Sequence, residues 1–416
     1  MRLLLRTVSV FGLLVVLCGT VEARRKIKVE IQLLPGACSP KEGCILYGRL
    51  VRHSNTIANN EHDRRKRINV QAGWRRFTRR SVKRKWIDIQ FQGQRQRTRS
   101  GHHGLFVARF AFPSNWKSSL RPRRVAEWGK PTAWGSRSGA LKVSVSFPKQ
   151  GRYLATSAIS SFVISRSLRG LSIVSDLDDT LIVSHAYSKR KVIKEAFAKH
   201  ASQIPVVPDA RLFLRSLLAA KGGGGSLHYV SGSPFAIIDR VLWLFHHRNF
   251  PVGDVHLSPV FRAHHYVKYK SFKYKVKHIS TIFRRNPHRR FLLLGDSGEK
   301  DPDVYAKIRK LFPKQVAGIF IRHVPTTKVG GKRYHKIFTF KTYQQALLEA
   351  RRRGWLSTPS SLPTKNLALP EQTCPLNAWR VVHSWIAQDD CRCPEGSVEQ
   401  IQWLQQQKVV RCVKKE

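Results

Sequence analysis

The fold of this chain is decided by one stretch, Leu171-Ser172-Ile173-Val174-Ser175-Asp176-Leu177-Asp178-Asp179-Thr180. Its apolar start predicts a buried strand, and its acidic end predicts a loop at the carboxyl end of that strand, the edge where open α/β sheets bind ligands. Asp176 and Asp178 fall on the same side if the strand conformation persists. Two like charges so close need a cation or a shared proton, which indicates a functional site. The alternative is structural, because Asp and Thr are also good loop and cap residues.

The pattern around this stretch is that of a parallel sheet. After Arg169, short apolar runs alternate with longer helical segments, which is typical of a doubly wound α/β domain. Buried strands are expected at Leu171–Ser175, Leu227–Val230, Phe291–Leu294 and Val316–Ile321. Helices are expected near Asp209–Ala220, Phe235–His246, Tyr274–Arg285 and Pro302–Phe312.

Three further features are expected at the same edge of that sheet. Tyr229-Val230-Ser231-Gly232-Ser233-Pro234 ends one strand with hydroxyls and amides that can hold a phosphoryl oxygen. Gly295-Asp296-Ser297-Gly298-Glu299-Lys300-Asp301 ends another with acids that suit a hard cation. Lys275 can reach the same point from the intervening helix. Each has a simpler reading: Ser231 as a helix cap, Lys275 as a surface lysine, and Asp301 as the N-cap before Pro302.

These motifs resemble the haloacid-dehalogenase-like phosphatase superfamily, whose members share an Asp-x-Asp pair, a strand-end Ser or Thr, a lysine and an acidic Gly-Asp segment. Within it they look like the phosphatidate phosphatases of the fungal actin-patch type and their bacterial relatives. The resemblance covers roughly residues 171–322, and its most specific part is the run from Gly295 to Pro302. It implies a doubly wound parallel sheet with a minimal capping domain.

The resemblance also implies a role for each motif residue. Asp176 would be the nucleophile that forms an aspartyl-phosphate, and Asp178 the acid and base that protonates the leaving group and then activates water. Ser231, Gly232 and Lys275 would bind the phosphoryl group. The implied magnesium ligands are Asp176, the main-chain carbonyl of Asp178, Asp296 and Asp301, the last through a metal-bound water or by orienting the lysine.

The substrate is less directly indicated. Only about fifty residues separate Asp178 from Ser231, which leaves little room for a capping domain and predicts an open site. The segment 261–270, just before Lys275, interleaves aromatic and cationic side chains. A contact with a membrane surface is one interpretation and an ordinary basic loop is the other. The expected contact residues are Arg262, Tyr266, Lys268 and Lys270.

Before the parallel sheet, residues 24–168 show a different pattern. Alternating apolar stretches between Gly, Pro and Ser clusters predict an antiparallel, sandwich-like β domain. The stretches are Ile27–Leu34, Cys44–Val51, Trp86–Phe91, Leu105–Phe112 and Ala140–Phe147. A dense basic stretch from Arg64 to Lys85 also holds Trp74, Phe77 and Trp86. It suits nucleic acid or an anionic membrane, but a solvated loop and strand edge is the preferred interpretation.

Charge and the chain's first residues bear on partner and compartment. The chain of 416 residues has 76 Lys and Arg against 25 Asp and Glu, a formal charge of +51 that attracts anionic partners. An apolar stretch after Arg2 and Arg6, with Val21-Glu22-Ala23 following, is typical of a signal peptide over residues 1–23. We therefore expect an exported protein, in the periplasm or outside the cell and peripheral on a membrane, with no membrane span after cleavage.

After removal of Cys18, six cysteines remain, and in an oxidising compartment they indicate disulfides. Cys38 and Cys44 flank a small loop that one bridge can close. The other four lie in the C-terminal tail, residues 357–416, and allow three pairings; a zinc site is the weaker alternative. They are Cys374, Cys391, Cys393 and Cys412.

Together, these features predict a catalytic domain over residues 169–356 and a magnesium-dependent phosphatase that converts phosphatidate to diacylglycerol. The anionic phospholipid surface is the expected partner; nucleic acid is not favoured, and no protein partner is indicated. One alternative is a phosphatase of the same type acting on soluble or nucleic-acid phosphomonoesters. The other is an exported polyanion-binding protein without turnover.

Overall fold

A computed structural model of the chain describes residues 26–39, 42–54, 66–113, 140–164, 169–184, 199, 201–220, 225–248, 250–260, 271–325 and 327–356. In the tail it describes only the backbone of five short strands, β14 (Gln372–Thr373), β15 (Arg380–Val382), β16 (Cys391–Arg392), β17 (Ser397–Leu404) and β18 (Gln407–Lys414). The expected signal peptide, the segment 261–270 and the side chains of the tail cysteines lie outside these residues. Among the described helices, none is long and apolar enough to cross a membrane.

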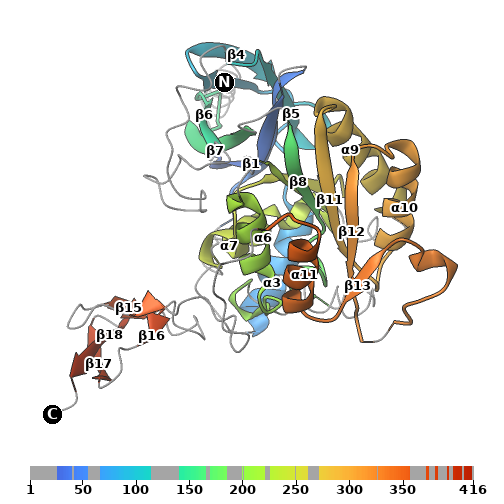
Figure 1. The fold of residues 1–416 in the computed structure, drawn as a ribbon. Helices are drawn as coiled ribbons and strands as arrows, with labels where there is room; N and C mark the ends of the chain where they lie inside the picture. The colour runs from blue at the N-terminus through green and yellow to red at the C-terminus, as the bar shows by residue number, and fades with distance from the viewer. Residues whose placement is uncertain are drawn as a thin grey trace, which may run out of the picture.

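The second half of the described chain forms a parallel sheet in the order β10-β9-β8-β11-β12-β13 (Figure 1). Every neighbouring pair in it is parallel, as the sequence predicts. The strands are β8 (Gly170–Ser175), β9 (Leu227–Pro234), β10 (Asp254–Ser258), β11 (Arg289–Asp296), β12 (Val316–Arg322) and β13 (Phe338–Phe340). β10 and β13 were not expected, because they are short and their sequences alternate weakly.

Helices cover both faces of this sheet, so the prediction of an α/β fold is confirmed. One face packs against α6 (Ala210–Ala219), α7 (Ile238–His247) and α11 (Tyr343–Arg352), with Phe213, Phe245 and Tyr343 in that core. The other packs against α9 (Ser271–Arg285) and α10 (Asp301–Leu311), with Phe283 and Ile308 in the core. Burial on both faces explains why the strands are nearly continuous apolar runs.

A buried polar network joins the amino ends of four neighbouring strands. Arg289 Nε on β11 donates to Ser172 Oγ on β8 at 2.6 Å, and Ser172 Oγ lies 3.2 Å from Ser226 Oγ. Ser226 Oγ lies 2.6 Å from His228 Nε2 on β9, whose Nδ1 lies 2.6 Å from Asp254 Oδ1 on β10. Since a buried polar group must keep its partner, this network resists slippage of the strands and so keeps their carboxyl ends aligned.

The first half of the chain forms a second sheet, in the order β4-β3-β6-β7-β1-β2-β5. All of its pairs are antiparallel except β1 with β7. The strands are β1 (Val29–Ser39), β2 (Gly43–Arg52), β3 (Trp86–Phe91), β4 (Gln94–Arg99), β5 (Leu105–Phe110), β6 (Ala140–Phe147) and β7 (Thr156–Ile164). We call this part of the molecule the β domain.

The predicted sandwich is not confirmed, because the described strands belong to one sheet rather than two. The sheet curls until its outer strands meet: Gln96 Oε1 on β4 accepts from Arg109 N on β5 at 3.0 Å, and Gln94 Oε1 accepts from Ala111 N at 3.1 Å. β4 itself was missed, since its sequence Gln-Arg-Gln-Arg-Thr-Arg contains no apolar residue to mark a strand. Side-chain bonds at a sheet edge leave no pattern of hydrophobicity in the sequence.

The disulfide expected within the first hairpin is present. Cys38 on β1 and Cys44 on β2 lie directly opposite each other and are bonded. The β domain also packs on the parallel-sheet domain, because Leu34 of β1 belongs to the same buried cluster as Phe213. Arg285 Nε at the end of α9 donates to Glu42 Oε2 at 2.5 Å.

The structure differs from the preferred interpretation of the basic stretch between β2 and β3, which was a solvated loop and strand edge. Residues Lys66–Thr78 form helix α3 instead. Arg76 of this helix is 5% exposed and its Nε donates to Asp239 Oδ2 of α7 at 2.8 Å. The helix was missed because its residues show no clear apolar stripe, and a tertiary ion pair rather than a hydrophobic face attaches it.

Candidate active site

The acidic residues lie where the order of the parallel sheet reverses. From β8 the chain continues to β9 and β10 on one side, and then returns to β11 on the other side. Ligands of open α/β sheets bind at such a reversal, outside the carboxyl ends of the strands. Asp176 directly follows β8 and Asp296 ends β11, with Asp176 N bonded to Leu294 O at 2.9 Å. The topology therefore places both aspartates in the expected crevice.

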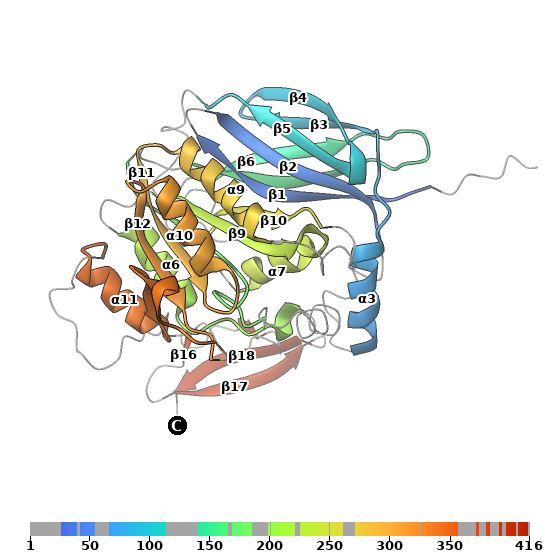
Figure 2. The same ribbon diagram turned by 90° about the vertical axis from the view of Figure 1, so that its right-hand side faces the viewer.

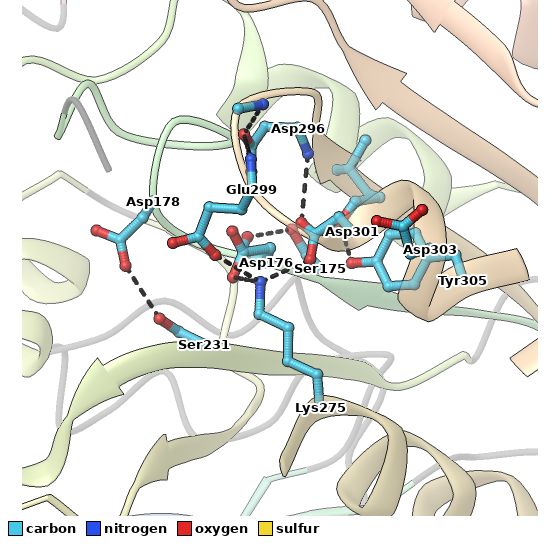
Figure 3. Close-up of polar contacts among 12 residues, drawn as sticks. Ser175, Asp176, Asp178, Ser231, Lys275, Asp296, Glu299, Asp301, Asp303 and Tyr305 are labelled. Carbon is cyan, nitrogen blue, oxygen red and sulfur yellow. Dashed lines mark hydrogen bonds and ion pairs between the residues drawn. The ribbon is translucent and has the colours of Figure 1, made fainter. Parts of the chain in front are cut away.

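Lys275 is the centre of the cluster of charges in this crevice (Figure 3). Its Nζ lies 3.0 Å from Asp176 Oδ1, 3.1 Å from Glu299 Oε2 and 2.6 Å from Asp301 Oδ1. The lysine side chain is 1% exposed, and Asp301 is fully buried. One ammonium thus binds carboxylates from β8, from the loop after β11 and from the start of α10.

Burial and crowding govern the protonation of this cluster. Burial alone would lower the pKa of Lys275, but Asp176, Asp301 and Glu299 together outweigh it, and the pKa lies well above its ordinary value. Burial raises the pKa of Asp176 well above its ordinary value, and neighbouring carboxylates add to this against the opposing effect of Lys275. The pKa values of Asp296 and Glu299 are raised by the same causes. Ionised Asp176 therefore depends on nearby positive charge.

Asp178 lies to one side of this cluster and has different partners. Its Oδ2 accepts from Ser231 Oγ at 3.0 Å and from Ser233 Oγ at 2.6 Å, both at the end of β9. Ser233 N in turn donates to Ser231 Oγ at 2.9 Å. Figure 3 shows Asp178 directed toward Ser231, whereas Asp176 is directed toward Lys275. Each of the two carboxylates is held by its own set of donors.

A tight turn directly follows the two carboxylates. The strand conformation ends at Ser175, so it does not persist through both aspartates, and Asp179 has φ of 51°. Leu181 N donates to Leu177 O at 2.9 Å, and Asp179 Oδ1 accepts from Ser184 N at 3.0 Å. Arg322 Nη1 donates to Asp179 O at 2.6 Å. These bonds hold the loop in which Asp176 and Asp178 reach different partners.

Two glycines allow the close approach of the neighbouring elements. A Cβ at Gly295 would collide with the carboxylate of Asp301 and would lie 2.7 Å from the ring of Tyr305. A Cβ at Gly232 would lie 3.1 Å from Cβ of Ser271, the first residue of α9. Without side chains at these positions, α9 and α10 can bring Lys275 and Asp301 against the strand ends.

The donor set of the crevice fits a divalent cation. Asp176, Glu299 and Asp301 place carboxylate oxygens within 4.8 Å of one another, but the ammonium of Lys275 already contacts all three. Among the residues that the structure describes, Asp176 Oδ2 and Asp296 Oδ2 are buried without a hydrogen-bond partner. Since buried carboxylate oxygens require compensation, these two are the better candidates for metal ligands.

Most of the residues that the sequence singles out come together here. Asp301 is not the N-cap of α10, however; Lys300 holds that position, and Asp301 binds the lysine instead. The four predicted surface contacts Arg262, Tyr266, Lys268 and Lys270 lie outside the described residues. The residues brought to the crevice are Asp176, Asp178, Ser231, Gly232, Lys275, Asp296 and Asp301. Their catalytic and metal-binding roles stay predictions.

Two residues of the site were not singled out, although both lie in motifs that were. Glu299 binds Lys275, and Ser233 donates to Asp178. A signal for Glu299 was its place in the acidic segment after β11, and a signal for Ser233 was its spacing of two from Ser231.

Replacing Ser233 by alanine should lower turnover about ten- to a hundredfold, because a hydrogen bond from a hydroxyl to a carboxylate contributes about 1.5 to 3 kcal/mol. Asp178 would keep one of its two donors and lose its fixed orientation. The measurement is the rate of phosphate release at saturating substrate, with Ser233→Thr as the control that retains the hydroxyl. A Ser233→Ala rate equal to that of the wild type would show that Ser231 alone positions Asp178.

Comparison with known families agrees with this geometry. Residues 171–323 match the family described as phosphatidate phosphatase APP1, catalytic domain. The phosphatidate phosphatase APP1 of Saccharomyces cerevisiae is 28% identical over 158 residues, covering 37% of this chain and 26% of the yeast protein. An uncharacterized protein of Schizosaccharomyces pombe is 25% identical over 156 residues, covering 37% and 25%. The chain thus matches about a quarter of the length of these relatives.

Among solved structures, a carbohydrate acetylesterase from Xanthomonas citri aligns over 92% of this chain and 91% of its own, with 9% identity and a TM-score of 0.24. That score is too low to show a shared fold. Residues 171–323 are therefore similar to the catalytic domain of the phosphatidate phosphatase APP1 family, which agrees with the resemblance that the motifs carry.

Proposed function

We propose that this chain is a phosphatase of the haloacid-dehalogenase type that hydrolyses phosphatidate to diacylglycerol and phosphate. The observation that supports it most is the crevice in which Lys275 lies 3.0 Å from Asp176 and 2.6 Å from Asp301, inside the segment that matches the phosphatidate phosphatase family. Such a site combines a carboxylate nucleophile with a fixed cation for a phosphoryl oxygen.

In the first step Asp176 attacks phosphorus. The bond from phosphorus to the glycerol oxygen breaks, and an aspartyl-phosphate forms on Asp176. Asp178 supplies the proton that the departing alkoxide takes. Because Asp176 and Asp178 have separate partners, one carboxylate can remain unprotonated for attack while the other carries the proton.

In the second step Asp178 accepts a proton from water, and the resulting hydroxide attacks the aspartyl-phosphate. Phosphate leaves and Asp176 is restored. Asp178 Oδ2 accepts two hydroxyl hydrogen bonds in the structure, which suits the unprotonated form that this step requires. Ser231 and Lys275 would bind the oxygens of the transferring group in both steps.

A magnesium ion would be held by Asp176 and Asp296, together with the main-chain carbonyl of Asp178. When bound, it would offset the charge of the phosphoryl oxygens and the mutual repulsion of the carboxylates. Lys275 cannot do this alone, since it is one ammonium against four carboxylates: Asp176, Asp296 and Asp301, which are buried, and Glu299, which is 21% exposed.

We further propose that the protein is exported. The disulfide between Cys38 and Cys44 supports this, because such bonds persist in oxidising compartments. The basic surface expected from a charge of +51 would then face anionic lipid outside the cytosol.

The proposed function is tested by phosphate release from a panel of substrates with Mg²⁺ present. We expect turnover of phosphatidate in vesicles to exceed that of soluble phosphomonoesters and to stop when EDTA removes the metal. Addition of Mg²⁺ in excess of the EDTA should restore it. Equal turnover of soluble phosphomonoesters would contradict the lipid assignment, and turnover that survives EDTA would contradict the metal dependence.

A further inference from the structure

Helix α3 has an exposed face that contains a tryptophan and no acidic residue. Trp74 is 58% exposed, whereas Ala72 and Arg76 of the same helix are buried. The exposed residues recur at intervals of three, one and three, so they share one side of the helix. They are Gln71, Trp74, Arg75 and Thr78.

This helix is attached beside the active site although it comes from the β domain. Nε of its Arg76 lies 2.8 Å from Oδ2 of Asp239 at the start of α7. Because the arginine side chain is buried, this ion pair attaches the helix to α7. α3 also packs against η3 (Phe235–Ile237), which directly follows the turn that carries Ser231 and Ser233. Figures 1 and 2 both show α3 next to α7. The helix therefore lies against the element that directly follows the turn carrying Ser231 and Ser233.

The chemistry of this face suits the boundary between water and an anionic lipid layer. Tryptophan is enriched at membrane interfaces because its ring is apolar and its N–H is polar. Arg75 beside it, and the exposed Arg80 just beyond the helix, are cations that attract acidic headgroups.

We propose that the outward face of α3, defined by Gln71, Trp74, Arg75 and Thr78, docks on an anionic phospholipid surface and brings the active site to its substrate there. The proposal rests on the proposed function, because hydrolysis at the lipid surface requires it. The measurement of vesicle binding does not depend on that function. It implies that binding to vesicles and hydrolysis at their surface fail together when the face is altered, while hydrolysis of a soluble phosphomonoester continues.

The test compares Trp74→Ala/Arg75→Ala with a matched variant, Trp86→Ala/Arg97→Ala. Trp86 is 44% exposed on β3, and the guanidinium of Arg97 lies 5.4 Å from the centre of its ring. Both variants lose one tryptophan and one positive charge. In Figure 2 strands β3 and β4 lie at the far end of the β domain from the parallel sheet. The matched variant therefore measures the effect of removing one positive charge and one tryptophan ring at a position away from the site.

Binding is measured first, by co-sedimentation with vesicles of phosphatidylcholine and phosphatidylglycerol, in an Asp176→Asn background. These vesicles contain no phosphatidate, so the result does not depend on turnover. We expect Trp74→Ala/Arg75→Ala to weaken binding about tenfold, since one cation alone contributes about fivefold at such a surface. The matched variant should weaken it less than threefold. Equal binding by all proteins, or equal loss in both variants, would overturn the proposal.

Activity is measured next, in the background that retains Asp176. Turnover of phosphatidate in vesicles should fall about tenfold in Trp74→Ala/Arg75→Ala, with turnover of a soluble phosphomonoester unchanged. A loss on the soluble substrate as well would show that α3 acts on the site itself, against the proposal. If the wild type hydrolyses no phosphatidate, the proposed function fails while the binding result still decides the docking. Loss of duplex DNA binding with vesicle binding retained would instead assign the face to nucleic acid.

Discussion

Replacing Asp176 by asparagine should lower phosphate release by about four orders of magnitude or more, the scale seen when a nucleophile is removed from an enzyme. The amide has the shape of the carboxylate but cannot form an acyl-phosphate in this way. The fold should survive, because burial already raises the pKa of Asp176 and a neutral side chain relieves the repulsion from Asp296, Glu299 and Asp301. Phosphate release and urea unfolding, measured on the same protein, check both parts.

Asp303→Asn is the matched control for this variant. Asp303 lies on α10, two residues after Asp301, but its carboxylate is 37% exposed and pairs with Arg333 at 2.9 Å rather than with Lys275. The control should change turnover by less than about threefold, as expected for an exposed ion pair away from the site. Activity of Asp176→Asn near that of the control would assign the nucleophile to another residue.

Replacing Lys275 by methionine should destabilise the protein by about 3 to 5 kcal/mol and abolish turnover. Methionine keeps the length of the side chain but leaves Asp176, Glu299 and Asp301 without the cation that each contacts within 3.1 Å. Since these carboxylates are buried, they must either repel one another or take up protons. The free energy of unfolding in urea, measured once with EDTA and once with Mg²⁺, gives the destabilisation by Lys275→Met without and with the metal.

Lys273→Met is the control here, because Lys273 lies two residues earlier on α9 and is exposed. It removes the same charge and should change the free energy of unfolding by less than about 0.5 kcal/mol. A second variant, Lys275→Met/Asp301→Asn, should be more stable than Lys275→Met alone, because it removes one uncompensated charge. If Lys275→Met matched Lys273→Met in stability, the ion pairs of Lys275 would contribute nothing measurable to the fold.

The parallel-sheet domain was largely predictable because its strands are buried on both faces. Runs such as Phe291–Leu294 need no partner to be recognised as core strands, and the polar residues after them mark the carboxyl edge. Lys275 was predictable through its place in a known set of motifs, near the start of α9, although one lysine among so many basic residues carries no signal of its own. Its burial at 1% exposure is what distinguishes it from the others.

The β domain and α3 were less predictable, because side-chain bonds and ion pairs between distant residues decide their structure. Gln94 and Gln96 bond the backbone of β5, and Arg76 binds Asp239, which lies more than one hundred and sixty residues away. Such contacts leave no periodicity in the sequence. The curled single sheet and the docked helix therefore appeared only in three dimensions.

By itself, the sequence determined that a parallel α/β domain carries its acidic motifs at the ends of its strands. Periodicity and turn chemistry act over a few residues, and they suffice for that. Only the tertiary structure decided that Asp178 bonds Ser231 and Ser233 while Asp176 bonds Lys275, and that Glu299 joins the lysine. The partner of a charged side chain depends on the packing of whole elements, such as α9 against β8 and β11, and on which charges that packing removes from water.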